Sequence, residues 1–282
     1  MSILVSIAIP FYNDEKYLEY AILSVINQTF QNWELLLMND GGKDGSLNIA
    51  TKYSKLDPRI KLFSDGVNKG LVARLNQSIL LAKGKYYARM DADDIMYKDR
   101  IRTQVEFLES NENVDIVGSS IMVIDDKNNI KGSGFSKGFS TGFVHPTIMG
   151  KIVWFRENKY NAKYVRAEDT ELWFRTSKHS VFYNIDKPLF FYREFGVPTL
   201  NKYIASMRTM KLIFRNYEEY GKTFKWAVIN YMISDIKILV YVLFSVLNKT
   251  EILISHRRKK VPVELCLNSD HLKDSIRPII GI

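Results

Sequence analysis

Residues 3–10 read ILVSIAIP, a short apolar run that is rich in β-branched residues and stops at Pro10. An apolar run of this length, without alternating polar positions, is typical of a strand buried on both faces of a parallel sheet. No basic region precedes it, which argues against a signal peptide. We therefore predict a central strand at Ile3–Ile9.

The chain that follows alternates between helix and strand patterns as far as Met90. Beyond the first strand, helices are predicted at Glu15–Ile26, Ser46–Leu56 and Gly70–Ala82, and strands at Trp33–Met38, Arg59–Phe63 and Tyr86–Met90. Such alternation predicts a doubly wound α/β domain, with a mostly parallel central sheet flanked by helices. Ligands of these sheets bind beyond the carboxyl ends of the strands.

The pattern changes beyond Asn158. Helical spacing recurs at Glu168–Ser177 and Leu200–Glu219, and a long apolar segment follows at Trp226–Leu247. We expect residues 1–215 to form the α/β domain and residues 216–282 to form a C-terminal helical extension, for which association with a membrane is one of two interpretations.

The apolar segment contains Asp235 and Lys237, so its longest stretch without charge is Ile238–Leu247. That is half of the roughly 20 residues that a bilayer span needs, and each charge near the centre of a span costs roughly 3 kcal/mol. One interpretation is an interfacial helix, with the basic run His256–Lys260 meeting anionic lipid headgroups. The other is an amphipathic helix that packs on the α/β domain.

The net charge and the single cysteine limit the classes of binding partner and the compartment that the protein can have. The 282 residues carry 40 Lys and Arg against 31 Asp and Glu, a formal net charge of +9, which favours an anionic partner. No motif for RNA or DNA accompanies this charge, so nucleic acid is not expected. Cys266 is the only cysteine, which excludes an intramolecular disulfide and a cysteine-rich zinc site and favours a reducing compartment.

An acidic motif, Asp91-Ala92-Asp93-Asp94, follows the predicted strand Tyr86–Met90. Three neighbouring carboxylates repel one another unless a cation neutralises them, and their oxygens suit Mg²⁺ or Mn²⁺. The alternative is an acidic turn in which Asp94 caps the next helix. The position after a core strand favours the ligand-binding interpretation.

Two more acidic positions are candidates. Asp40 follows the strand Trp33–Met38, where a carboxylate can accept hydrogen bonds from a ligand, although Asn-Asp-Gly-Gly is also an ordinary turn. Glu168-Asp169 opens a predicted helix, where a carboxylate can act as a general base or only complement the helix dipole. Neither a dinucleotide-binding nor a P-loop glycine pattern occurs near a strand end, which argues against a nicotinamide enzyme or a P-loop kinase.

Taken together, several ordered blocks resemble the family 2 glycosyltransferases, which are inverting enzymes with a GT-A fold. The blocks are Val5–Asn13, Ser24–Phe30, Trp33–Gly42, Asn68–Leu71, Gly84–Met90 leading into the D-x-D element at Asp91-Ala92-Asp93, His145–Met149, Glu168–Trp173 and Pro188–Arg193. The likeness covers about residues 3 to 195.

The resemblance implies a nucleotide-sugar donor, usually UDP-linked, and a divalent cation, Mn²⁺ or Mg²⁺, on its diphosphate. Asp93 would be the principal metal ligand, assisted by Asp91, and Asp169 would be the general base that deprotonates the acceptor hydroxyl in a single displacement. The implied nucleotide-sugar-binding residues are Pro10, Tyr12, Asn13, Asp40, Arg89, Asp91 and Ala92. The implied acceptor-side residues are His145, Glu168 and Trp173.

Two departures from the family pattern affect the donor contacts. The second block reads Asn39-Asp40-Gly41-Gly42 in place of the usual acidic pair and serine. Many relatives carry an Arg directly before the Asn of the third block, but Leu75 precedes Asn76 here and Arg74 lies one position earlier. Either Arg74 or Arg89 would then contact the diphosphate. His145 approaches the metal or the acceptor, or it is structural.

The leading hypothesis is a bacterial-type inverting glycosyltransferase of polysaccharide or lipopolysaccharide biosynthesis. It would act on a glycan or lipid-linked glycan, as a cytoplasmic protein held peripherally at the inner membrane. One alternative is a sugar nucleotidyltransferase, although the glycine-rich N-terminal phosphate loop of that class is missing. The other is a non-catalytic nucleotide-sugar-binding or membrane-associated protein.

Overall fold

A computed structural model of the chain describes residues 5–134, 138–139, 142–250, 252–253 and 267–278. The strands are β1 (Val5–Phe11), β2 (Trp33–Asn39), β3 (Ile60–Ser64), β4 (Tyr86–Arg89), β5 (Ile95–Met96), β6 (Ile116–Ile124), β7 (Ile130–Gly134), β8 (Gly138–Phe139), β9 (Met149–Lys151) and β10 (Phe182–Arg193). The helices are α1 (Leu18–Ile26), α2 (Ser46–Leu56), α3 (Leu71–Leu81), α4 (Arg100–Ser110), α5 (Ile152–Glu157), α6 (Glu168–Thr176), α7 (Leu200–Arg215), α8 (Phe224–Val246) and α10 (Ser269–Ser275), with 3₁₀ turns η1 (His145–Thr147) and η2 (Ala162–Tyr164). The basic run His256–Lys260 and Cys266 lie outside the described residues.

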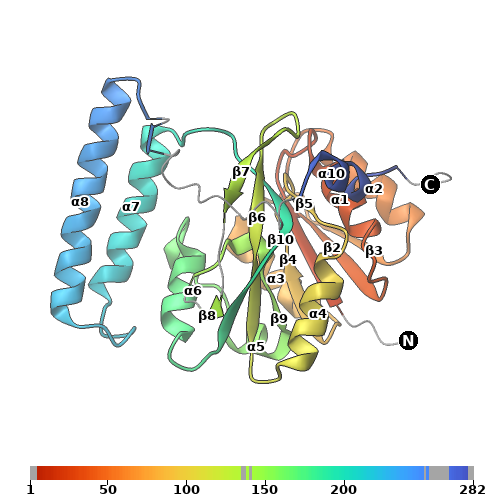
Figure 1. Ribbon diagram of the computed structural model, residues 1–282, viewed down its shortest axis with the longest axis horizontal. Coiled ribbons are helices and arrows are strands. Elements are labelled where there is room, and N and C mark those ends of the chain that lie inside the picture. Colours follow the sequence, from red (N-terminus) through yellow and green to blue (C-terminus); the bar gives the residue numbers. More distant parts are fainter. Residues whose placement is uncertain (1–4, 135–137, 140–141, 251, 254–266, 279–282) are drawn as a thin grey trace.

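One sheet runs through the α/β part, in the order β3-β2-β1-β4-β9-β6-β10-β5, and helices flank it (Figure 1). Strands β1 to β4 are parallel to one another, as are β6 and β10. The short strand β9 runs antiparallel between β4 and β6. The predicted α/β class with a mostly parallel central sheet and helical C-terminal elements is confirmed.

Strand β1 continues through Pro10 to Phe11, past the predicted end at Ile9. The carbonyl of Ala8 accepts a hydrogen bond from Met90, so the backbone of Ala8 faces β4. The backbone of Pro10, two residues further on, faces the same side, beyond the point where β4 has ended. The missing N–H of Pro10 therefore removes no ladder hydrogen bond, and a proline is tolerated in a central strand.

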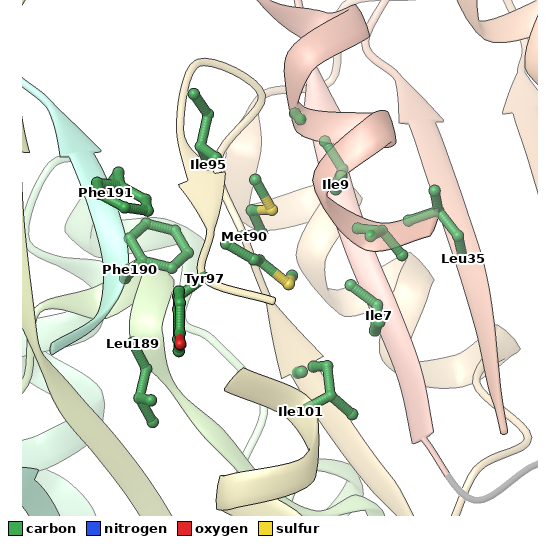
Figure 2. Close-up of a cluster of buried hydrophobic side chains, with 14 of the residues drawn as sticks. Ile7, Ile9, Leu35, Met90, Ile95, Tyr97, Ile101, Leu189, Phe190 and Phe191 are labelled. Carbon is green, nitrogen blue, oxygen red and sulfur yellow. The ribbon is translucent and has the colours of Figure 1, made fainter. Parts of the chain in front are cut away.

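The core beneath the carboxyl edge of the sheet joins β1, β4, β5 and β10 (Figure 2). Phe190 and Phe191 of β10 lie against Ile95 and Met90, and all four side chains are fully buried. Met90 and Ile95 flank the acidic motif on either side. Their burial fixes both ends of the intervening turn, so the carboxylates of residues 91–94 are presented from a rigid support.

Helices α7 and α8 lie side by side next to the sheet (Figure 1). The rings of Tyr203 and Tyr241 stack with centroids 3.8 Å apart, and Lys211 pairs with Asp235. By length and composition alone, helix α8 could cross a membrane, with a mean hydropathy of 1.7 over 18 residues. Much of its apolar surface is exposed, and Asp235 and Lys237 interrupt it near the middle. The division into residues 1–215 and 216–282 stays a prediction.

Candidate active site

A cavity of about 440 Å³ opens where β1, β2 and β4 end. Its walls are formed by Pro10, Phe11, Tyr12, Asp14, Asp40, Asn68, Gly70, Leu71, Arg74, Arg89, Asp91, Ala92 and Asp93. All residues predicted to bind the nucleotide sugar or the metal are in this set, except Asn13. The structure thus brings together side chains from four separate blocks of sequence, as expected at the carboxyl edge of a parallel sheet.

The carboxylates of Asp91, Asp93 and Asp94 form a compact acidic group. Each offers an oxygen atom, and these atoms lie within 4.8 Å of one another. Burial, together with the charge of Asp91, raises the pKa of the Asp93 carboxyl to about 7. Within the described part of the chain, Oδ2 of the buried Asp94 has no hydrogen-bond partner. Clustered hard oxygens with uncompensated charge fit a divalent cation such as Mg²⁺ or Mn²⁺.

Asp94 does not cap a helix, which corrects the alternative interpretation of the motif. Helix α4 begins after Asp99. Oδ1 of Asp94 instead accepts a hydrogen bond at 2.7 Å from the backbone N–H of Arg193, at the end of β10. Asp94 therefore ties the acidic turn to the neighbouring strand rather than to the helix that follows it.

Arg89 occupies the floor of the cavity as a buried cation. Nη2 donates to Asp91 Oδ1 at 2.7 Å, while the buried Nε and Nη1 atoms have no partner among the residues that the structure describes. Burial lowers the pKa of the guanidinium, but the surrounding acidic side chains, Asp91, Glu168 and Asp169 among them, outweigh it and raise the pKa. Unpartnered donors on a buried cation suit an anionic ligand such as a phosphate oxygen.

All three guanidinium nitrogens of Arg74 donate hydrogen bonds to other groups of the protein. Its Nε donates to Asp40 at 2.9 Å, and its terminal nitrogens bind Asp65, Gln77 and the carbonyl of Val67. Of the two arginines that the sequence proposed for the diphosphate, Arg89 is the one with unpartnered donors.

Asp40 is buried at the cavity wall and accepts hydrogen bonds from two backbone N–H groups as well as from Arg74. These come from Lys69 and Gly70, at the start of α3, at 2.8 and 3.0 Å. The carboxylate thus holds the first turn of that helix and complements its positive end. Its predicted contact with the nucleotide sugar stays a prediction.

In the loop after β1, Tyr12 and Asp14 line the cavity, whereas Asn13 does not. Tyr12 is 48% exposed at the cavity mouth. Asn13 adopts a left-handed conformation with φ of 57°, and its Oδ1 accepts a hydrogen bond from Lys43 N at 2.7 Å. Asn13 therefore joins two loops behind the cavity. Asp14, absent from the predicted set, lines the cavity, and burial raises its pKa. The signal that could have identified Asp14 is its position four residues after Pro10, where the first apolar run ends.

The predicted acceptor-side residues form a second group around η1 and α6. Asp169 lies in the first turn of α6, and its side chain is 29% exposed. Oδ2 of Asp169 is 3.9 Å from Nδ1 of His145, whose Nε2 is 2.7 Å from the hydroxyl of Tyr160. Burial and the charge of Arg89 hold the pKa of His145 well below its usual value, so the imidazole is neutral. The separation of His145 from Asp169 is longer than a hydrogen bond.

Trp173 and Glu168 are both buried. Trp173 is 3% exposed and packs edge-on beneath His145 and against Trp154. Trp173 therefore supports His145 from the buried side. Its predicted role on the acceptor side stays a prediction. Burial, with the nearby charge of Asp169, raises the pKa of Glu168.

Arg89 connects the two groups. It lines the cavity with Asp91 and Asp93, and its charge also acts on Asp169, Glu168 and His145. The charge of Arg89 therefore acts both on the cavity and on the surroundings of Asp169. This arrangement suits a reaction in which an anionic group leaves on one side and a hydroxyl attacks from the other.

Comparison with known proteins identifies the class. The glycosyl transferase family 2 model matches residues 6–184, and the chain belongs to this family of glycosyltransferases. An uncharacterized glycosyltransferase of Haemophilus influenzae is 33% identical over 265 residues, which cover 86% of this chain and 78% of the relative.

Two solved structures share the fold. S. aureus TarS (residues 1–349) in complex with UDP-GlcNAc aligns with a TM-score of 0.62 and 17% identity, over 75% of this chain. The alignment covers 65% of that TarS chain, less than two thirds of its length. The mannosyltransferase PcManGT of Pyrobaculum calidifontis, in complex with GDP-Man and Mn²⁺, aligns with a TM-score of 0.61 and 13% identity, over 96% of this chain and 85% of that one.

Proposed function

We propose that this chain transfers a sugar from a UDP-sugar to a hydroxyl of a glycan or lipid-linked glycan, with inversion, in a single displacement. The observation that carries the proposal is Arg89, which hydrogen-bonds to Asp91 and lines the cavity with Asp93, and whose pKa is also raised by the charge of the general-base candidate Asp169. The nucleotide-sugar class is supported by the ligands of the fold neighbours, UDP-GlcNAc in TarS and GDP-Man in PcManGT. The choice of UDP rests on the family resemblance.

In this mechanism each residue has one task. Pro10, Tyr12 and Asp40 line the nucleoside end of the cavity, and Arg89 donates its unpartnered N–H groups to the diphosphate. Asp93 and Asp91 would hold the divalent cation, which supplies Lewis-acid stabilisation of charge on the diphosphate when bound.

On the acceptor side, Asp169 accepts the proton of the acceptor hydroxyl as that oxygen attacks the anomeric carbon. The new glycosidic C–O bond forms as the C–O bond to the diphosphate breaks, and the nucleoside diphosphate leaves with the bonding electron pair. The neutral His145 fills the space beside Asp169 and is itself held by Tyr160.

We further propose that the protein is cytoplasmic and binds the inner membrane peripherally through residues 216–282. The exposed apolar side chains of α8, among them Met232, Leu239 and Leu243, support this placement. Asp235 and Lys237 near the middle of α8 favour a helix in the interface over one that spans the bilayer.

A donor screen tests the function. Thermal unfolding is measured with a panel of UDP- and GDP-sugars in Mn²⁺, with and without a chelator, and the best donor is then assayed for transfer to a hydroxyl acceptor. We expect stabilisation by one UDP-sugar that the chelator abolishes. Asp93→Asn should lose this stabilisation, Asp169→Asn should keep it but transfer at least 100-fold more slowly, and the surface variant Asp126→Asn should match the wild type. Wild-type turnover by Asp169→Asn, or release of pyrophosphate in place of transfer, would overturn the proposal.

A further inference from the structure

A second cavity, of about 520 Å³, lies between the end of β10 and the helix pair α7 and α8. Asp93 lines both this cavity and the donor cavity. The second cavity therefore reaches the acidic group at Asp93. A ligand here would approach the same reaction centre as the donor.

Aromatic and aliphatic side chains form most of the wall. They include Tyr192, Phe195, Tyr203, Ile236, Val240 and Tyr241. Tyr241 stacks on Tyr203, and its hydroxyl hydrogen-bonds to the carbonyl of Pro198, in the segment after β10. These contacts join α7, α8 and the end of the sheet, so the cavity has defined walls.

The polar groups are confined to part of the lining. Asp93, Arg193 and Glu194 mark the end at the acidic group. Lys237 projects from α8, and no ion pair links its ammonium group to any other residue that the structure describes. Among the described lining residues, Lys237 is thus a cation without an ion pair, and an apolar cavity with such a cation suits an amphipathic anion.

The cavity is continuous with the exposed apolar surface of α8. Ile236 and Val240 line it while remaining 57% and 36% exposed. The same helix exposes Met232, Leu239 and Leu243. An apolar surface this broad on one helix marks an interaction site, and through Ile236 and Val240 it gives a hydrocarbon chain an apolar path along α8 into the cavity.

We propose that this cavity binds the hydrocarbon chain of a lipid-linked acceptor, with the phosphate of that lipid at Lys237 and its sugar directed toward Asp93. The inference rests on the proposed transferase function and adds the acceptor class and its site. The apolar wall and its continuity with the exposed apolar surface of α8 favour a lipid over a soluble sugar, which would need more polar partners.

The test uses geranylgeranyl phosphate below its micelle-forming concentration, titrated into the full chain by calorimetry without vesicles. Geranylgeraniol, inorganic phosphate and maltotriose are the comparison ligands. Val240→Trp fills the cavity, whereas Leu239→Trp places the same ring on the neighbouring exposed position. Lys237→Gln removes the cation, and Lys225→Gln on the same helix is its control. Binding of UDP with Mn²⁺ is measured for every variant.

We expect Val240→Trp to weaken geranylgeranyl phosphate binding at least tenfold and Leu239→Trp to change it less than twofold. Lys237→Gln should weaken the phosphate more than the alcohol, and UDP binding should stay within twofold throughout. If UDP binds but the lipid does not, or if Val240→Trp leaves lipid binding unchanged, this inference is wrong while the transferase proposal stands. Maltotriose binding that Val240→Trp abolishes would assign the cavity to a soluble glycan and overturn the lipid assignment. A wild-type chain that binds no nucleotide would count against the transferase function itself.

Discussion

Arg193 Nε donates a hydrogen bond to the backbone carbonyl oxygen of Asp93 at 2.7 Å. The backbone N–H of the same residue binds Asp94, and its Nη2 binds Asn128 at 2.6 Å. The guanidinium also lies over the ring of Tyr17, 4.3 Å from the centroid. One residue at the end of β10 therefore holds the acidic turn against the loop between β6 and β7.

Replacement of Arg193 should loosen the acidic group. We expect Arg193→Gln to lower Mn²⁺ affinity, measured by calorimetry with UDP present, about tenfold. The free energy of unfolding should fall by about 1–3 kcal/mol, because charge-assisted hydrogen bonds to buried carbonyls are lost. Arg102→Gln, which removes a surface bond to the Thr29 carbonyl, is the control. Unchanged Mn²⁺ affinity in Arg193→Gln would show that the turn holds its shape alone.

The buried pair of Arg74 and Asp40 should be strongly coupled. Arg74→Met leaves Asp40 without its cation and should cost about 3–5 kcal/mol in urea denaturation, as for one partner of a buried ion pair. The double variant Arg74→Met/Asp40→Asn should cost less than the sum of the single variants, by about 1–3 kcal/mol. Additive effects would mean that the pair at 2.9 Å does not stabilise the start of α3.

Arg89 should be more important for ligand binding than for the fold. Because the buried Nε and Nη1 atoms have no partner among the described residues, and the one ion pair of Arg89 is with the partly exposed Asp91, Arg89→Met should change the free energy of unfolding by no more than about 1 kcal/mol. Affinity for UDP should nevertheless fall at least tenfold, with a smaller loss in Arg89→Lys, which keeps the charge. Wild-type UDP affinity in Arg89→Met would remove Arg89 from the donor site.

His145 should make stability depend on pH below about 6.5. In the unfolded chain the imidazole titrates near about 6.5, whereas burial and Arg89 hold the folded pKa well below that. Between these two values the unfolded chain binds the extra proton, so stability falls as the pH falls, by up to about 1.4 kcal/mol per pH unit. The stability of the wild type relative to His145→Gln should shrink from pH 7 to pH 5. The exposed His179→Gln is the control, and a constant difference for His145→Gln would contradict a buried neutral imidazole.

The exposed face of α8 should bind anionic membranes. We expect sedimentation with vesicles containing anionic lipid at low salt, with less binding at high salt because the attraction is screened. Leu239→Glu with Leu243→Glu should abolish it, whereas Leu80→Glu, at a 63% exposed position on α3, should not. Equal binding to neutral vesicles would place the effect on apolar contact alone.

Local patterns predicted the N-terminal half of the fold to within a few residues. Strands β1 to β4 and helices α1 to α3 each coincide with a segment whose apolar spacing predicted that element. Helix α6 begins at Glu168, as expected. The long strand β10 and helix α4 were not predicted. The sequence of β10 lacks the regular pattern of a buried strand. In the structure its register with β6 accordingly shifts on either side of Pro188.

The sequence by itself determined the parallel sheet and the acidic motif at its edge, because apolar spacing and the carboxylates of Asp91 and Asp93 are local properties. The tertiary structure decided which groups remain available to a ligand. Arg74 and Arg89 are both buried cations, yet the first is consumed by Asp40 and Asp65, while the second keeps unpartnered donors. The support of Asp93 by Arg193, a hundred residues away in sequence, likewise depends on where β10 ends beside the turn. Hydrogen-bond partners are chosen by distance in space, which no local pattern encodes.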